Sequence, residues 1–387
     1  PIHNHIHEVS MKLRQTAYKT VFILGLSVSL FGCATPEIQK MSAIDAVKFG
    51  NTQFFEMPNY RFDMDAKLLD LRVTDKASDP KSIRFNKYMS YFGKHLTFGS
   101  SGVIDTENQQ FQMIPSYGFE SKNAKGSIRF PIVYDHKQKI LFADLSALSG
   151  LITDVENEGK YSKFSTANLP IPADADVKLV QLMRKYATVF YDDLKPEAFV
   201  DQPLTDTDRA QKAVRKIQVT IKPQEALEKL PMMLQDIAGV FTPEGQKPST
   251  SLPDAVISQM KEEMSKVLGE NSKDVYSIAF NRAGQIVSMN ADSVYEMDLS
   301  KAGKTDASAP VMNMRFNVNM NVSDIGTAKL IDPPTVENTV DGKENFKGGL
   351  LGGLFAGKSD EEQTSNEVTA DAIEIDAASA VSAAAED

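Results

Sequence analysis

The clearest hydrophobic pattern in the chain lies between residues 311 and 322, where apolar and polar side chains alternate without a break. The apolar positions are Met312, Met314, Phe316, Val318, Met320 and Val322, and the polar positions between them are Asn313, Arg315, Asn317, Asn319 and Asn321. Successive side chains of a β-strand point to opposite faces of its sheet. The pattern therefore predicts one long strand with an apolar face and a solvated face.

A similar alternation begins at Tyr60 and changes phase near Leu68, after which the apolar residues are Leu69, Leu71 and Val73. A one-residue change of phase turns every later side chain to the other face of the sheet, so the pattern predicts a β-bulge near Leu68. Shorter apolar runs bounded by turn residues predict further strands. They cover residues 95–104, 111–117, 128–132, 139–145, 217–221, 276–280 and 287–291.

Apolar residues at three- and four-residue spacing predict amphipathic helices in other segments. The first helix begins at Asp174 or Asp176, and its stripe consists of Leu179, Met183, Tyr186, Ala187 and Phe190. A second, over residues 223–237, should be bent or divided by Pro231, and a third covers residues 253–268. A shorter helix over residues 42–49 is expected to end at Gly50.

Many strands with one apolar face, together with a few amphipathic helices, are typical of an α+β protein. We expect a large curved antiparallel sheet that does not close and that the helices cover only in part. A partly covered sheet of this kind leaves an apolar cleft.

The N-terminal part of the chain reads as a secretory leader. Basic residues follow Met11, and a run of about eleven mainly apolar residues extends from Val21 to Phe31. This run is too short for a transmembrane helix, which needs roughly 20 apolar residues. Three alternating histidines before Met11 are expected to be an upstream extension and not a metal site; they are His3, His5 and His7.

The end of this leader, Leu30-Phe31-Gly32-Cys33, resembles a bacterial lipobox. The resemblance implies acylation of Cys33, cleavage before it and, because Ala34 and not an aspartate follows, a location in the outer membrane on its periplasmic face. Three acyl chains would hold a protein on a membrane permanently, since two already give stable attachment. The alternative is an ordinary buried thiol behind an ordinary signal peptide.

The formal net charge of −10 is unevenly distributed along the chain. Residues 359–387 contain nine acidic residues and no Lys or Arg, whereas residues 1–32 contain three basic residues and one acidic residue. The part between them is nearly neutral and has no basic stripe of the kind that binds nucleic acid. A Gly-Leu patch and the acidic, Ala-rich end predict disorder from about residue 342.

Sequence signatures of catalysis are absent. No Gly-x-Ser-x-Gly, His-Glu-x-x-His, phosphate-loop or paired-cysteine motif occurs, and beyond the leader the histidines are His95 and His136, expected on a strand and in a turn. Asp63 and Asp65 could pair for acid-base work, but their alternation with apolar residues predicts the solvated face of a strand. We therefore expect no enzyme, no cofactor and no metal, with a carboxylate-dependent envelope enzyme as an alternative.

The order of elements over residues 215–335 resembles the LppX/LprG-type lipoproteins, which are similar in turn to the LolA/LolB lipoprotein carriers. The segments that carry the resemblance are Val219-Thr-Ile-Lys-Pro223, Glu225-Ala-Leu227, the hairpin at Asn281 to Gly284, Val322-Ser-Asp-Ile-Gly326 and Leu330-Ile-Asp-Pro-Pro334. The resemblance implies a half-open β-barrel over helices, enclosing a hydrophobic cavity for acyl chains. This chain departs from the family in its greater length, in Pro231 and in its acidic tail.

These observations predict four segments. Residues 1–32 form the extension and leader, 33–58 a lipidated tether, 59–341 one α+β half-barrel domain, and 342–387 a disordered tail. The predicted apolar ligand face consists of Phe62, Met64, Met289, Met312, Met314, Phe316, Val318 and Met320. Methionine suits a surface that accommodates variable apolar shapes, although each methionine could instead fill the core.

The predicted function is that of a membrane-anchored, non-enzymatic envelope lipoprotein that binds or carries a lipid or another hydrophobic ligand. The alternative is an envelope scaffold or assembly protein whose protein partners contact a sheet edge or the acidic tail.

Overall fold

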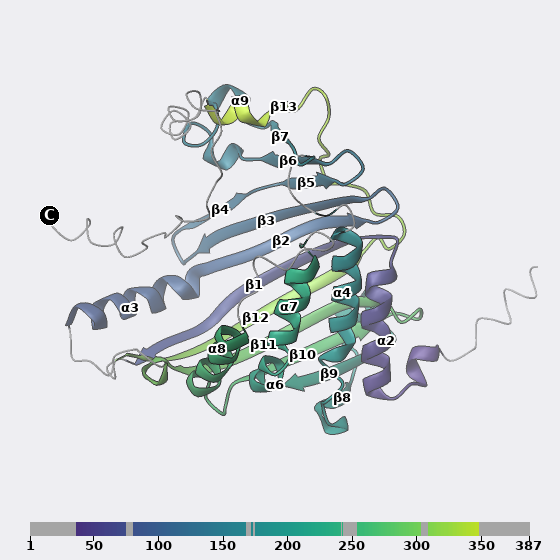
Figure 1. Ribbon diagram of the computed structural model, residues 1–387, viewed down its shortest axis with the longest axis vertical. Helices are drawn as coiled ribbons and strands as arrows, with labels where there is room; N and C mark the ends of the chain where they lie inside the picture. Colours follow the sequence, from purple (N-terminus) through teal and green to yellow (C-terminus); the bar gives the residue numbers. More distant parts are fainter. Residues whose placement is uncertain are drawn as a thin grey trace, which may run out of the picture.

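The structure is a computed structural model, and it describes residues 36–74, 80–167, 172, 175–240, 242, 254–302 and 309–347. Cys33, the leader with its three histidines, and the acidic tail beyond residue 347 lie outside these described residues. Within the described part, thirteen strands form one sheet (Figure 1). The strands are β1 (Asn59–Thr74), β2 (Leu96–Asp105), β3 (Gln110–Glu120), β4 (Lys125–Arg129), β5 (Ile132–Asp135), β6 (Ile140–Asp144), β7 (Tyr161–Ser165), β8 (Phe199–Gln202), β9 (Arg215–Ile221), β10 (Lys273–Phe280), β11 (Ile286–Asp298), β12 (Val311–Ser323) and β13 (Thr339–Asp341).

The sheet is open. Its strand order is β13-β7-β6-β5-β3-β2-β1-β12-β11-β10-β9-β8, with β4 paired to β3 beside β5, and the terminal strands β13 and β8 do not pair with each other. All pairs are antiparallel except β13 with β7, so the sheet is mixed and not antiparallel throughout. The predicted α+β class, with a large curved sheet that does not close, is confirmed.

The centre of the sheet is the pair of long strands β1 and β12. Their register shifts between Leu68 and Asp70, which confirms the predicted bulge. The long alternating strand predicted at residues 311–322 is β12, and the turn with Gly284 joins β10 to β11. The predicted strand at residues 128–132 is instead two strands, because Pro131 between β4 and β5 has no N–H to donate to the ladder.

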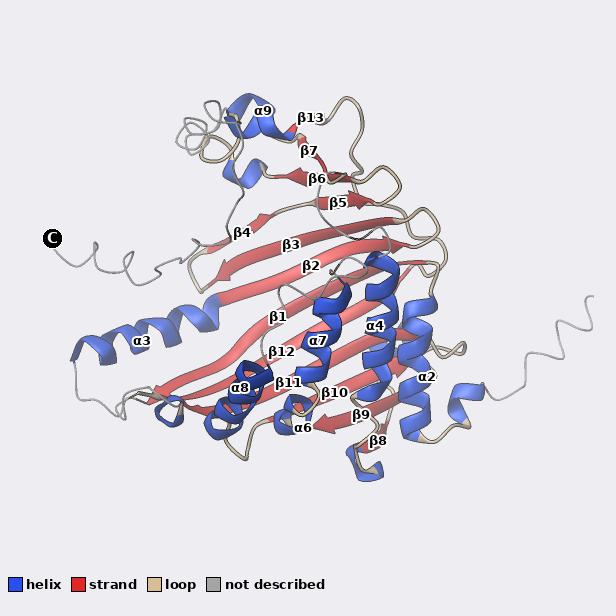
Figure 2. Cartoon of the chain, viewed as in Figure 1, coloured by secondary structure: helices blue, strands red, loops and turns tan. Residues whose placement is uncertain are grey.

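Helices cover one face of the sheet at its β8–β11 end (Figure 2). The long ones are α2 (Ala43–Glu56), α4 (Ala175–Val189), α7 (Leu230–Val240) and α8 (Asp254–Val267), and shorter ones are η2 (Glu37–Gln39) and α6 (Pro223–Leu227). The short α5 (Asp206–Ala210) lies on the opposite face, where Asp208 pairs with Lys216 of β9. The predicted division at Pro231 is confirmed, since α6 and α7 are separate helices. Pro231 is the second residue of α7. Backbone N–H groups in the first turn of a helix have no acceptor within the helix, so a proline there removes no helical hydrogen bond.

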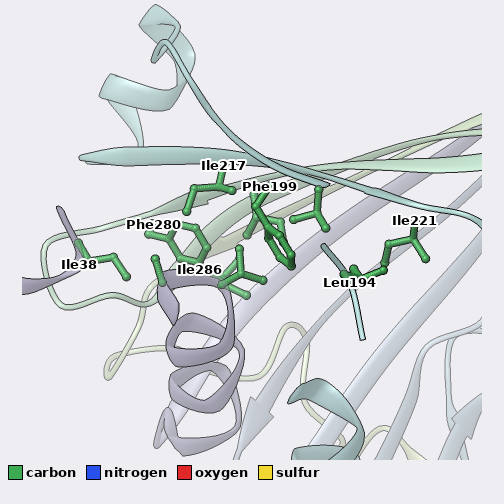
Figure 3. Packing of buried hydrophobic residues seen from close by; sticks show 11 residues of the cluster. Ile38, Leu194, Phe199, Ile217, Ile221, Phe280 and Ile286 are labelled. Carbon is green, nitrogen blue, oxygen red and sulfur yellow. The ribbon is translucent and has the colours of Figure 1, made fainter. Parts of the chain in front are cut away.

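The main core lies between α2 and strands β9–β11 (Figure 3). Ile38, Val47 and Phe280 are fully buried in it. The segment 36–58 is thus packed into the domain, and the prediction of a tether is wrong for these residues. A Cβ on Gly50 would lie 2.3 Å from the Phe280 ring, so Gly50 permits close approach of α2 to β10 and does not end the helix.

The long helix α3 (Pro80–His95) was not predicted. It directly precedes β2, so His95 ends a helix and does not lie on a strand, whereas His136 lies in the β5–β6 turn as expected. Phe85, Tyr88, Met89 and Phe92 recur at three- and four-residue spacing, so the sequence carried a signal for this amphipathic helix that the prediction did not use.

The C-terminal boundary also differs from the prediction. Residues 342–347 are not disordered: α9 (Gly342–Lys347) follows β13, and Asn345 is buried. The Asn345 side chain donates to Ser162 Oγ at 2.8 Å and accepts from the Asp154 amide at 3.2 Å, while the rings of Phe346 and Phe164 lie 5.6 Å apart. Two hydrogen bonds and a ring contact thus order a segment of polar composition.

Candidate ligand groove

The face of the sheet beneath the helices carries a row of methionines. Met289 of β11 is directly opposite Met320 of β12, and Met320 is directly opposite Met64 of β1. In the next row on the same face, Val318 lies between Ala291 and Ala66. Residues opposite each other in adjacent strands share a face, so the structure brings four of the predicted ligand-face residues together.

The other predicted residues lie on the same face but have different surroundings. Phe316 stacks on Tyr295 with ring centroids 5.4 Å apart. Met314 and Met312 follow it along β12 at two-residue spacing. Phe62 packs against a small cluster of buried residues that includes Met57 and Tyr60. Phe62 therefore fills core, as the alternative interpretation of these side chains allows.

A pocket of about 340 Å³ opens where this face meets the helices. It is lined by Asn51, Phe54 and Phe55 of α2, by Met183, Tyr186, Ala187 and Phe190 around α4, and by Ile286, Met289 and Met320 of the sheet. No charged side chain is among these residues. The size and lining are those of a site for an apolar group, since ligand pockets span roughly 300–1,000 Å³.

The apolar face continues beyond the helices onto β1, β2 and β3. Register places Phe98 opposite Ala66 on one side and opposite Tyr117 on the other. Met64, Phe98 and Tyr117 are 39%, 43% and 47% exposed, and the rings of Phe98 and Tyr117 meet edge to face at 5.9 Å. We call the set Met289, Met320, Met64, Phe98 and Tyr117 the apolar floor.

Sequence reasoning missed Phe98 and Tyr117 as members of this face. Both lie in segments predicted as strands, so the available signal was their alternation within those strands. Alternation identifies which residues of one strand share a face, but only the register between strands shows that they continue the methionine row.

The opposite face of the central strands is polar. Asp63 and Asp65 are exposed there, which confirms the prediction of a solvated strand face, and Asn319 donates to Asp65 at 3.1 Å. Arg315 pairs with Asp292 at 2.6 Å, and hydrogen bonding from Arg315 lowers the pKa of Asp292. The two sides of the sheet are therefore chemically distinct.

A hydrogen-bonded group joins two of the covering helices. Tyr186 of α4 donates its hydroxyl to Asp236 Oδ2 of α7 at 2.8 Å, and Lys185 Nζ lies 2.6 Å from the same oxygen. The hydrogen bond from Lys185 is the main cause that lowers the pKa of Asp236. Burial, followed by the bond to Asp236, raises the pKa of Tyr186. Because Tyr186 also lines the pocket, this group positions one of its walls.

Replacing Tyr186 with phenylalanine is expected to lower the free energy of unfolding at pH 7 by about 1 kcal/mol, the worth of one hydrogen bond. The folded-state pKa of Asp236 is depressed, so its contribution is present at neutral pH and is lost as the pH falls through that value. Urea unfolding of the variant and the parent at pH 7 and pH 3 should show the difference shrink in acid. Tyr88→Phe on exposed α3 is the control, and equal stability of Tyr186→Phe and the parent at pH 7 would contradict the assignment.

The histidines have ordinary surroundings. His95 Nδ1 lies 2.8 Å from the carbonyl oxygen of Glu120, and its ring contacts Tyr91 and Phe119. Across the ranges that the structure describes, no three His, Cys, Asp or Glu side chains are grouped so that they could hold a metal ion. In the same ranges, no helix combines the length and the hydrophobicity needed to cross a membrane.

Comparisons with known proteins give weak similarity to solved structures alone. No family model matches the sequence, and no curated protein matches it. Among solved structures, the chain is similar to one titled "Lipid-protein interactions in lipovitellin", with 11% sequence identity and a TM-score of 0.20. The similarity covers 73% of this chain and 27% of that one, so the chain spans about a quarter of that protein. A likeness of this size carries no argument about what the chain binds.

Proposed function

We propose that the chain is a membrane-anchored, non-enzymatic envelope lipoprotein that binds or carries a lipid or another apolar ligand on its apolar floor. The observation that carries the proposal is the exposure of Met64, Phe98 and Tyr117 on a face whose other half is buried under helices. Contiguous exposed apolar surface of this kind is unusual in soluble proteins and marks ligand or interaction sites.

The chemistry of the pocket supports an acyl chain or a similarly shaped apolar group as ligand. Uncharged side chains line it, with Asn51 and Tyr186 as its polar members. Met183, Met289 and Met320 converge there from a helix and two strands. Methionine side chains are flexible and polarizable, so such a wall adapts to chains of different length and branching.

The membrane anchor in this proposal is acylated Cys33. Two residues lie between Cys33 and Pro36, the first described residue, and the three steps from Cα to Cα span at most about 10 Å. Because η2 and α2 are packed into the domain, an acylated Cys33 would hold the body close to an outer-membrane surface and not at the end of a long tether.

Native mass spectrometry tests the proposed function. The chain lacking residues 1–33 is purified, its bound lipid is extracted, and the melting temperature is measured with a long-chain and, as a control, a short-chain fatty acid. We expect co-purifying lipid and a rise in melting temperature with the long chain only. Absence of both co-purifying lipid and any ligand-induced rise would contradict the proposal.

A further inference from the structure

Helix α3 is strongly basic and rich in aromatic residues. From Pro80 to His95 the sequence contains no acidic residue, and its Lys and Arg residues are Lys81, Arg84, Lys87 and Lys94. The same segment contains six large apolar residues, namely Ile83, Phe85, Tyr88, Met89, Tyr91 and Phe92. All six are exposed.

The side of α3 that carries Gly93 packs on the sheet. A Cβ on Gly93 would lie 2.8 Å from Leu68 and 3.3 Å from Leu71, so this side of α3 rests directly on β1. The large side chains are exposed to solvent: Phe85 is 62% exposed and Tyr88 is 58% exposed. Exposure of so many aromatic side chains on one element requires a partner or an apolar medium.

Part of this exposed surface leads to the apolar floor. Phe85, Met89 and Phe92 recur at four- and three-residue spacing and therefore lie along one side of the helix. The ring of Phe92 is 6.0 Å from the ring of Phe119, which lies two residues beyond Tyr117 on β3 and so on the same face. We call Phe85, Met89 and Phe92 the α3 stripe.

We propose that α3 lies in the interface of an anionic phospholipid membrane, with the α3 stripe among the acyl chains and Arg84 and Lys87 at the headgroups. Helices with a basic polar face and Phe or Leu on the other face bind membranes in this way. Charge complementarity favours a lipid surface over a second copy of the chain, because two copies would bring like-charged helices together.

This contact is separate from the proposed anchor at Cys33. Helix α3 projects at the opposite end of the molecule from α2, which follows the first described residues (Figure 1). A second contact there fixes the orientation of the body on the bilayer and places the α3 stripe and Phe119 between the lipid and the apolar floor. This contact does not require ligand binding. Loss of vesicle binding would therefore overturn the membrane contact of α3 alone, and absence of co-purifying lipid would count against the proposed function alone.

The absence of tryptophan from the chain permits a local test. Phe85→Trp introduces a single reporter in the full chain, and Val200→Trp on β8, also exposed, serves as the matched control. Emission is recorded with vesicles of phosphatidylcholine alone and of phosphatidylcholine with phosphatidylglycerol, with and without brominated acyl chains. The same titrations are repeated with Arg84→Gln and Lys87→Gln added.

We expect blue-shifted emission and bromine quenching for Phe85→Trp with the anionic vesicles, and neither for Val200→Trp. Each basic residue near an anionic surface is worth roughly a fivefold gain in affinity, so the double Gln variant should bind about 25-fold more weakly. Unchanged emission with anionic vesicles would overturn the proposal. A blue shift without vesicles that grows with protein concentration would also overturn it, because a second copy would then cover the helix.

Discussion

Replacement of Phe280 with alanine is expected to lower the free energy of unfolding by about 3–5 kcal/mol, the usual cost of truncating a buried aromatic side chain. The Phe280 ring is fully buried, at 0% exposure, and lies in the core between α2 and β10. Gly50 of α2 lies so close to this ring that any side chain at position 50 would push the helix away from β10. Urea unfolding followed by far-UV circular dichroism measures the loss.

Phe85→Ala is the matched control, because it removes the same side chain from an exposed position on α3. Its effect should stay within about 0.5 kcal/mol, as for most surface substitutions. Equal losses for the two variants would contradict the packing of α2 against β10 as the centre of the core.

Replacement of Met320 with glutamate is expected to weaken binding of a long-chain fatty acid by at least about 100-fold, because burying an unpaired carboxylate under the ligand costs several kcal/mol. Met320 lies in the middle of the methionine row and also lines the pocket between α2 and α4. Its side chain is half-buried, so the free protein can solvate the new charge. Displacement of a fluorescent fatty acid measures the affinity.

Asn321→Glu provides the control for this variant. Asn321 adjoins Met320 in β12, is exposed on the polar face, and undergoes the same change of charge. We expect parental affinity for it. Melting curves of both variants separate loss of the site from loss of the fold, and equal weakening of two equally stable variants would contradict the apolar floor as the ligand site.

The sequence was most informative where a strand has one face on the core and one in water. The alternation in β12 and the change of phase at Leu68 predicted a strand, its two faces and its bulge, because each of these depends on neighbouring residues only. Met312, Met314 and Met320 share one face of β12 for the same reason. The extension of that face to Phe98 and Tyr117 depends on the pairing of β1, β2 and β3, which alternation within one strand does not specify.

The wrong predictions concern residues whose role depends on distant partners. Gly50 reads as a helix end until the Phe280 ring, 230 positions away in sequence, shows why a glycine is needed inside α2. Asn345 lies in a polar segment that reads as disordered until its bonds to Ser162 and Asp154 are known. Helix α3 has large apolar residues at helical spacing, so the sequence could have predicted the helix, but the exposure of these residues depends on how the helix packs on β1.

Photo-crosslinking with a fatty acid that carries a diazirine in the middle of its chain shows directly whether the apolar floor binds the ligand. The probe is bound to the chain lacking residues 1–33, activated by light, and located by peptide mass spectrometry. We expect labels on the apolar floor, at Met320, Met64 and Phe98, and their loss in Met320→Glu. Labels on the polar face, at Asn319 and Asn321, would contradict binding on the apolar floor. Labelling that an excess of unmodified fatty acid does not reduce would also contradict it, because such labelling is nonspecific.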